Sequence, residues 1–349
     1  ICVHLDGLPL AIELAAARVR QLPLAEMLPR LTSRLTLLTD GFRDLPARQQ
    51  TLHDTIAWSY DLLDKGEKRL FRRFAVFVGG AILEAVEAVC SGDGDLGGDG
   101  MDSVAALVDK SLLRQVNTQG GARFTMLETI REFAVEQLVD AGELAAIELR
   151  HASWFLALAE EAEPHLARPE TQLDWFTRLD TEAANLEAAF AWSHADPADA
   201  ERTNLGLRLA AAVWRFWSVR SSAGEAHDRM EAILALAVDG HGSAAHAAAL
   251  QGASVLAREL GDYPSAQRLL HESVSIARGL GDPCRLADIL IDLGWLTCLH
   301  LESDDARAHL RESLEIFRAE GSVRQEAMVL SRLCYVEFTD AQYEPARAL

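Results

Sequence analysis

Residue types in the last part of the chain recur at a fixed spacing of forty positions. Positions one or two such steps apart are identical: Ala247, Ala287 and Ala327; Leu250, Leu290 and Leu330; Ala266, Ala306 and Ala346. A fixed period of this length with two helices per unit is typical of an α-solenoid, in which each unit buries its apolar side against its neighbours. Gly261-Asp262 and Gly281-Asp282 are expected to end successive helices. The repeat therefore predicts stacked helix pairs over 241–349.

The step of forty is longer than that of the standard tetratricopeptide repeat, so the predicted repeats are tetratricopeptide-like. Small residues at fixed positions would allow the paired helices to approach closely. The concave side of such a solenoid offers a long groove for a protein or a small effector.

The composition indicates a mainly α-helical chain with large apolar cores, since hydrophobic residues make up 49% and alanine and leucine are abundant. The formal net charge of -20 disfavours non-specific binding to DNA or to an anionic membrane. No uncharged apolar run is long enough to cross a membrane. The five cysteines are scattered without a CxxC pair, which indicates neither a zinc site nor a disulfide framework. We therefore expect a cytoplasmic location.

The pattern of residues 51–141 differs from that of the repeats. Three predicted helices, 51–63, 67–77 and 82–90, are followed by the glycine-rich loop SGDGDLGGDG and then by a further helix. The strands LLRQVN and ARFTML around the turn TQGG predict a hairpin, and 128–138 predicts a closing helix. Helices followed by a small β-hairpin wing indicate a winged-helix domain.

Residues 142–240 are predicted to form long helices that precede the solenoid. They are rich in aromatic side chains: Trp154, Phe155, Trp175, Phe176, Phe190, Trp192, Trp214, Phe216 and Trp217. Aromatic residues at helical spacing indicate packing between helices rather than a ligand cage.

The stretch Gly7-Leu8-Pro9-Leu10, followed by AIELAAARV, resembles the GLPL motif late in the nucleotide-binding region of NB-ARC-type signal-transduction ATPases. The stretch TIAWSYDLLDKGEKRLFRRFAVFVGG, with ARFTMLETIREFAVEQL, is similar to the winged-helix module of the bacterial branch. Members of that branch are described as predicted ATPases or LuxR-type transcriptional regulators with helical repeats. The resemblance covers essentially the whole chain and implies that 1–50 is the helical end of a nucleotide-binding region.

The resemblance implies a nucleotide-facing position for Pro9, with Gly7 and Leu8 beside it. A proline fixes the backbone and lacks an N–H, so it offers a rigid apolar surface to a base. The alternative is that the motif only begins a helix. ADP or ATP with magnesium would be the cofactor of the parent protein, and we expect no tight nucleotide binding by the present chain.

The phosphate-binding sequence GxxxxGK[ST] is absent, because none of Lys65, Lys68 and Lys110 follows a glycine. In the resembled family this loop lies upstream of GLPL. We therefore expect the chain to be an internal part of a longer protein and not to hydrolyse ATP on its own. No HExxH or GxSxG pattern is found, and we expect no catalytic or metal-binding residues.

The resembled family has a second nucleotide sensor, a Met-His-Asp triplet where the last strand of the winged helix meets its helix. The matching residues here are Met126-Leu127-Glu128. Leu127 can donate no hydrogen bond to a phosphate, so this sensor is not expected to read the nucleotide. Glu128 is interpreted as a negative charge at a helix N-terminus.

Two further patterns receive structural interpretations. A basic cluster on the second winged-helix helix contains Lys65, Lys68, Arg69, Arg72 and Arg73. It could contact DNA phosphates, but the acidic chain favours a solvated face or a domain contact.

The sequence GGDGMDSVA (97–105) fits one copy of a calcium-binding nonapeptide. Read as an EF-hand loop it has Val104 where a glutamate is required, which favours an acidic surface loop.

The favoured interpretation is the regulatory and sensor part of a cytoplasmic nucleotide-switch ATPase, expected to be a transcriptional regulator. Its solenoid would bind a protein or small effector, self-association stays open, and DNA would be contacted only by an output domain outside this chain. The alternative is a helical-repeat interaction scaffold without a nucleotide switch. In a weaker third interpretation the winged helix binds DNA directly through Arg72 and Arg73.

Overall fold

The computed structural model describes residues 52–91, 100–118, 121–237, 242–299 and 303–339. Over these residues the chain is mainly helical with one small antiparallel sheet, which confirms the predicted fold class. Two compact units are present. The first holds the described residues up to Phe155 together with Asp180–Ala189, and the second holds Leu156–Leu179 and the described residues from Phe190 onward.

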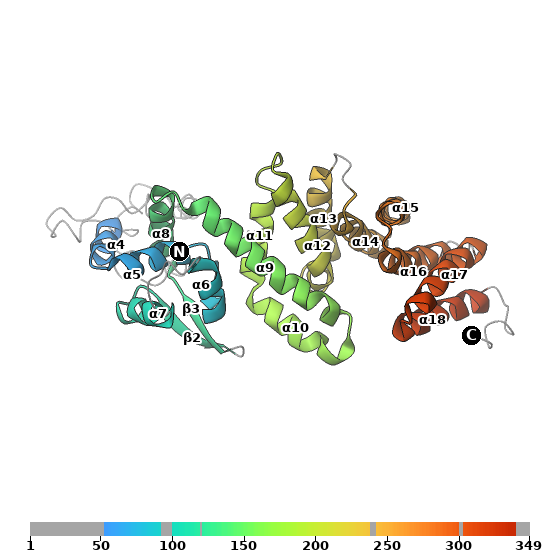
Figure 1. The fold of residues 1–349 in the computed structure, drawn as a ribbon, viewed down its shortest axis with the longest axis horizontal. Coiled ribbons are helices and arrows are strands. Elements are labelled where there is room, and N and C mark those ends of the chain that lie inside the picture. The colour runs from blue at the N-terminus through green and yellow to red at the C-terminus, as the bar shows by residue number, and fades with distance from the viewer. Residues whose placement is uncertain (1–51, 92–99, 119–120, 238–241, 300–302, 340–349) are drawn as a thin grey trace, which may run out of the picture. The chain divides into compact units, whose positions relative to one another are not determined.

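The first unit contains the winged-helix elements, blue to green in Figure 1. In chain order they are α4 Leu52–Asp61, α5 Lys65–Phe74, β1 Ala81–Ile82, α6 Leu83–Cys90, α7 Gly100–Asp109, β2 Arg114–Thr118, β3 Gly121–Thr125 and α8 Glu128–Asp140. The predicted order of helices, hairpin and closing helix is confirmed.

The sheet contains one strand that the sequence pattern did not predict. Its order is β1-β3-β2, and β1 pairs with β3 through Ala81 opposite Phe124. A strand of two residues is too short to show an alternation of apolar and polar positions. Gly80 precedes it at φ +87°, and a Cβ there would lie 2.1 Å from the Phe124 carbonyl oxygen, so only glycine fits this entry to the sheet.

The core of the winged helix is aromatic. Phe71 and Phe74 of α5 are fully buried, and the ring centroid of Tyr60 lies 5.3 Å from that of Phe71 and 5.6 Å from that of Phe133 on α8. Asp64 caps α5 by accepting a hydrogen bond from the Glu67 backbone N–H at 2.9 Å. The apolar face of α5 is thereby fixed against α8.

A buried ion pair ties Asp180–Ala189 to the sheet within the first unit. Arg123 of β3 donates to both carboxylate oxygens of Glu182, at 2.6 and 3.0 Å, and to the carbonyl oxygens of Gly79 and Gly80. Asn185 accepts from the Val78 backbone N–H and donates to the Gly80 carbonyl and to Glu182. These bonds satisfy the buried polar groups of this region.

Long helices follow the winged helix: α9 Leu144–Leu166, α10 Pro169–Thr181, α11 Ala183–Ser193, α12 Ala200–Arg220 and α13 Ala223–Leu236. Most of their aromatic side chains are buried: Phe155, Phe176, Phe190, Trp214, Phe216 and Trp217. In the second unit the ring of Phe190 lies 5.0 Å from that of Trp217. Burial confirms the prediction that these aromatics serve packing.

The repeats form successive helices, orange to red in Figure 1: α14 Ala244–Glu259, α15 Tyr263–Leu280, α16 Pro283–Leu299, α17 Ser303–Glu320 and α18 Val323–Thr339. Gly261 and Gly281 adopt the left-handed backbone, at φ +81° and +66°, at the predicted helix ends. Asp262 then caps α15 by accepting from the Ser265 N–H.

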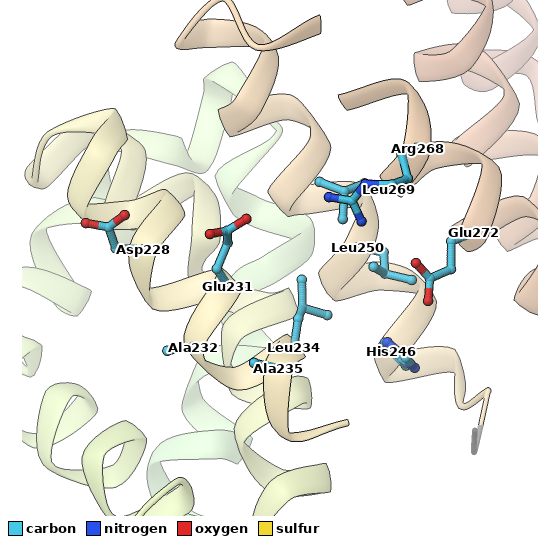
Figure 2. A pocket seen from close by; sticks show the side chains of 10 residues that line it. All are labelled: Asp228, Glu231, Ala232, Leu234, Ala235, His246, Leu250, Arg268, Leu269 and Glu272. Carbon is cyan, nitrogen blue, oxygen red and sulfur yellow. The ribbon is translucent and has the colours of Figure 1, made fainter. Parts of the chain in front are cut away.

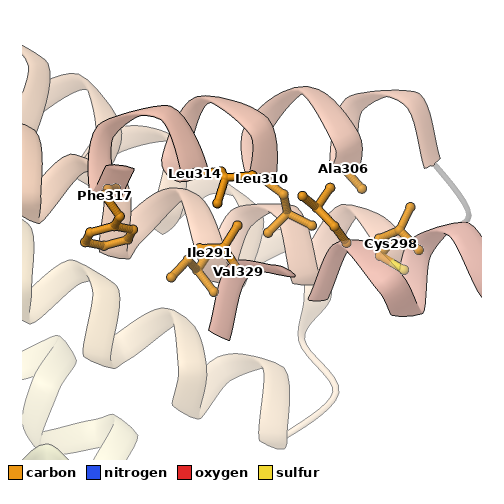
Figure 3. Packing of buried hydrophobic residues seen from close by; sticks show 10 residues of the cluster. Ile291, Cys298, Ala306, Leu310, Leu314, Phe317 and Val329 are labelled. Carbon is orange, nitrogen blue, oxygen red and sulfur yellow. The ribbon is translucent and has the colours of Figure 1, made fainter. Parts of the chain in front are cut away.

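The forty-residue period also appears in the hydrogen bonds. Ser273 on α15 donates to the Ala247 carbonyl on α14 at 2.7 Å, and Ser313 on α17 donates to the Ala287 carbonyl on α16 at 2.8 Å. Figure 3 shows the apolar core between α16, α17 and α18, where Leu310 and Phe317 are among the buried side chains. Serines at equivalent repeat positions thus join α14 to α15 and α16 to α17.

Candidate binding groove in the helical repeats

The nucleotide-facing residues expected from the sequence, Gly7, Leu8 and Pro9, lie outside the described residues. Met126 and Leu127 lie between β3 and α8, and Glu128 occupies the first turn of α8, as interpreted from the sequence. There Glu128 accepts from Arg131 Nη2 at 2.6 Å. Leu127 offers no polar side-chain atom at this junction.

The basic cluster on α5 is largely occupied by acidic partners. Arg72 and Arg73 both donate to the carboxylate of Glu143, and Arg73 also donates to the Cys90 carbonyl at 2.7 Å. Hydrogen bonding to Arg72 and Arg73 outweighs burial and lowers the pKa of Glu143 to about 2. Lys68 lies 3.7 Å from a carboxylate oxygen of Asp61. Arg72 and Arg73 therefore hold the domain together.

The two helices before the hairpin present no positive side chains. Helix-turn-helix proteins usually dock by placing one helix in the major groove of DNA. Here α6 and α7 carry neither lysine nor arginine, and α7 carries Asp102 and Asp109. On β3, Arg123 is buried against Glu182 and is not available to a phosphate.

An arginine-rich cavity of about 480 Å³ lies within the second unit. We call it the arginine groove. It is lined by side chains of α9, α12, α14, α16 and α18 and by the turn after α9: Glu163, Pro164, Ala167, Arg168, Ala211, Trp214, Arg215, Ala248, Gln251, Arg285, Asp288, Ile291, Asp292, Arg324, Gln325, Met328 and Arg332.

The groove uses the same repeat position in α14, α16 and α18 but fills it with different residues. Ala248, Asp288 and Met328 are forty apart and all line the cavity. The neighbouring positions Ala247 and Ala287 are identical and fully buried. The repeat therefore maintains the packing positions and varies the positions that face the groove.

Two groove arginines are held in place by aromatic rings. The guanidinium of Arg215 lies 4.2 Å from the ring centroid of Trp214, and that of Arg332 lies 4.2 Å from the ring centroid of Trp295. Burial lowers the pKa of Arg215. Within the described ranges neither of these arginines, nor Arg285, forms an ion pair within 4.0 Å. Their hydrogen-bond donors thus remain available to an anion.

Two aspartates sit among these arginines. Burial raises the pKa of Asp288 to about 6, although Arg285 and Arg215 favour its charged form. Burial also raises the pKa of Asp292, which accepts a hydrogen bond from Gln251 at 2.7 Å. Both carboxyl groups are therefore harder to ionise in the groove than in water.

Arg324 links two parts of the lining of the arginine groove. Its Nη2 donates to the Ala167 carbonyl, 3.1 Å away, in the turn after α9. This bond joins the last described helix to the first helix of the groove lining.

A second cavity of about 550 Å³ lies between α13 and the first repeat pair. Figure 2 shows Glu231 and Leu234 of α13 opposite His246 and Leu250 of α14 and Glu272 of α15. Burial lowers the pKa of His246. This cavity is mainly acidic, in contrast to the arginine groove.

The sequence predicted a groove on the solenoid but not the residues that line it. The forty-residue period could have pointed to some of them, because residues one period apart occupy equivalent positions in successive repeats. Arg285 and Gln325 are one such pair in the lining, and Asp292 and Arg332 are another. In the part of the chain that the structure describes, no group of three or more His, Cys, Asp or Glu is arranged to hold a metal ion. No described helix is long and apolar enough to cross a membrane.

Comparison with known families identifies two classes of module. Residues 63–139 match the family described as a winged helix-turn-helix domain, and residues 245–319 match the family described as a tetratricopeptide repeat. The chain therefore joins a winged helix-turn-helix to tetratricopeptide repeats.

The chain is also similar to individual proteins over longer stretches. The chain is 36% identical over 329 residues to the "Putative HTH-type transcriptional regulator Rv0890c" of Mycobacterium tuberculosis and to its counterpart Mb0914c of Mycobacterium bovis. The match covers 91% of this chain and 36% of each relative, so the chain spans about a third of their length. It is also 40% identical over 152 residues to an uncharacterized Mycobacterium tuberculosis protein, over 43% of this chain and 39% of that one.

Among solved structures, similarity is distant. A STAND protein with a tetratricopeptide repeat sensor from Pyrococcus horikoshii gives a TM-score of 0.38 at 15% identity, over 95% of this chain and 57% of that one. BtubC from P. vanneervenii gives a TM-score of 0.43 at 14% identity, over 58% and 87%.

Proposed function

We propose that the chain is the regulatory and sensor part of a nucleotide-switch protein that controls transcription, with the arginine groove as its effector site. The observation that carries the sensor role is the cavity of about 480 Å³ lined by arginines without ion-pair partners among the described residues. The names of the relatives support a role in transcription. The nucleotide switch is supported by the resemblance of Gly7-Leu8-Pro9-Leu10 to the GLPL motif.

In this proposal the two modules bias one equilibrium. Nucleotide state in the upstream domain would change how the winged helix packs, and an effector in the groove would shift the same equilibrium by its differential affinity for the two states. ATP hydrolysis would use a phosphate-binding loop of the longer protein, since residues 1–349 contain no GxxxxGK[ST] sequence. ADP or ATP with magnesium would be held by the longer protein, with Pro9 against the nucleotide.

The experiment is a titration of labelled ADP and ATP, with magnesium, against the full-length parent and against residues 1–349. We expect binding by the parent, weakening in its Pro9→Ala variant, and weak or absent binding without turnover by 1–349. Pro23→Ala, which changes the next proline along the chain, is the matched control. A parent that binds no nucleotide would reject the switch and leave the interaction scaffold as the better account.

Direct DNA binding by the winged helix is a competing function, because its family is described as helix-turn-helix. The acidic α7 does not favour it. Joint substitution of Arg72 and Arg73 would not test it cleanly, since both bind Glu143. Arg114→Ala, at an exposed position on β2, is cleaner: a loss of DNA affinity with a reduced salt slope would support direct binding, and we expect neither.

A further inference from the structure

The lining of the arginine groove is rich in positive charge although the chain as a whole is negatively charged. The chain has a formal net charge of -20, yet five arginines line this one cavity. Three acidic residues share the lining, Glu163, Asp288 and Asp292, and burial raises the pKa of both aspartates. Five arginines against three carboxyl groups leave the lining with a positive balance in a chain whose net charge is negative.

The arginines are also prepared for binding. Arg215 and Arg332 are stacked on Trp214 and Trp295, so less side-chain freedom is lost when their planar donors meet a ligand. Arg285 reaches the same cavity from the first turn of α16. Guanidinium groups bind carboxylate and phosphate oxygens in pairs of parallel hydrogen bonds, which favours these two groups over a halide or a neutral sugar.

The size of the cavity favours a small molecule over an extended chain. A volume of about 480 Å³ lies in the range of sites for small ligands. The hydrogen bond from Arg324 to the Ala167 carbonyl joins two parts of the lining, α18 and the turn after α9. Trp214, Ile291 and Met328 add apolar surface beside the arginines, which suits an organic ligand.

We infer that the arginine groove binds a small organic polyanion, whose phosphate or carboxylate groups are held by Arg215, Arg285 and Arg332. This inference rests on the proposed effector site and gives its ligand a chemical class. It does not depend on the nucleotide switch, since an anion site in the groove would stand even in a simple scaffold.

The test uses residues 1–349 in isothermal titration calorimetry at pH 7 and low salt. Inorganic pyrophosphate and citrate are the two probes, and they separate a phosphate ligand from a carboxylate ligand. Arg285→Gln and Arg332→Gln should each weaken binding of the preferred probe roughly tenfold or more, because each removes a charge-assisted hydrogen bond. Arg311→Gln, at an exposed position on α17, which contributes no residue to the groove lining, removes the same charge away from the groove and should leave binding unchanged.

Arg332→Lys keeps the charge but loses the planar pair of donors, and its affinity should lie between those of the wild type and Arg332→Gln. Circular dichroism of every variant shows whether the helices remain intact, and Arg285→Gln serves alone if Arg332→Gln does not fold. The inference is overturned if neither probe binds, if the groove variants bind as the wild type does, or if Arg311→Gln weakens binding equally. It is also overturned if poly-glutamate binds in an Arg285-dependent manner while both small probes do not, since the occupant would then be an acidic peptide.

The nucleotide titration separates this inference from the proposed function. Binding of pyrophosphate or citrate in the groove together with a parent that binds no ADP or ATP would preserve the anion site and reject the switch. The reverse result would preserve the switch and reject the anion site.

Discussion

Asp288 should cost the repeats stability near neutral pH, and its removal should therefore stabilise the chain. Burial raises the pKa of this carboxyl from its ordinary 3.8 to about 6. Each pKa unit corresponds to about 1.4 kcal/mol, so the ionised side chain costs the folded state up to about 3 kcal/mol above pH 6. As the pH falls from 6 to 3.8, the folded state takes up a proton that the unfolded state does not, and the cost disappears.

The substitution Asp288→Asn keeps the shape and removes the charge. At pH 8 we expect the variant to be more stable than the wild type by up to about 3 kcal/mol, and at pH 5 by roughly half as much. Urea unfolding followed by tryptophan fluorescence measures the difference, since Trp214 lines the groove and Trp295 contacts the groove residue Arg332.

The matched control is Glu315→Gln, at an exposed position on α17, which should change the free energy of unfolding by no more than about 0.5 kcal/mol. Equal or lower stability of Asp288→Asn at pH 8, or a gain that does not depend on pH, would refute the reasoning. A confirmed gain would mean that the groove keeps a destabilising charge, as binding sites do when stability is exchanged for function.

Three further perturbations test the packing described above. Glu182→Ala should destabilise the first unit by about 3–5 kcal/mol, because it leaves the buried Arg123 charge without its partner; urea unfolding measures this. His151 is buried and its pKa is lowered by burial from 6.5 to about 4. The first unit should therefore lose about 3 kcal/mol of stability as the pH falls from 6.5 to 4, and His151→Gln should remove that part of the pH dependence. Ser273→Ala and Ser313→Ala should each cost about 1 kcal/mol, and their effects should add in the double variant because they lie in different repeats.

Each of these expectations has its own contrary outcome. Glu326→Ala removes an exposed ion pair with Arg318 and should lower the free energy of unfolding by less than about 1 kcal/mol. An equally small loss in Glu182→Ala would contradict the burial of the Arg123–Glu182 ion pair. An unchanged pH profile in His151→Gln would assign the acid sensitivity to other groups. Strongly non-additive effects of the two serine substitutions would show that the two sites are energetically coupled.

Much of the fold followed from local sequence patterns. The forty-residue step set the register of the repeats, and Gly281 stands at the helix end where it was expected. The predicted domain limits 1–50, 51–141, 142–240 and 241–349 remain predictions. The two-residue strand Ala81–Ile82 was missed because its existence depends on pairing with β3 rather than on its own pattern.

The site was less predictable because its contacts join distant positions. Glu143 lies about seventy residues from Arg72 and Arg73, and no local rule connects them. The sequence favoured a solvated face or a domain contact for that cluster without deciding between them. Arg215 and Arg332 become groove residues only when α12 and α18 face the same cavity. The repeat period could name equivalent positions, but not the direction in which each one faces.

The serine bonds have a mechanical consequence for the repeats. Each bond lies inside a helix pair, α14 with α15 or α16 with α17, and contact within these pairs is more extensive than between α15 and α16 or between α17 and α18. When the repeats deform, each pair should therefore move as a rigid unit. The displacement should occur at the interfaces between α15 and α16 and between α17 and α18. A small rotation between neighbouring pairs would widen or narrow the arginine groove. Every helix would keep its internal structure.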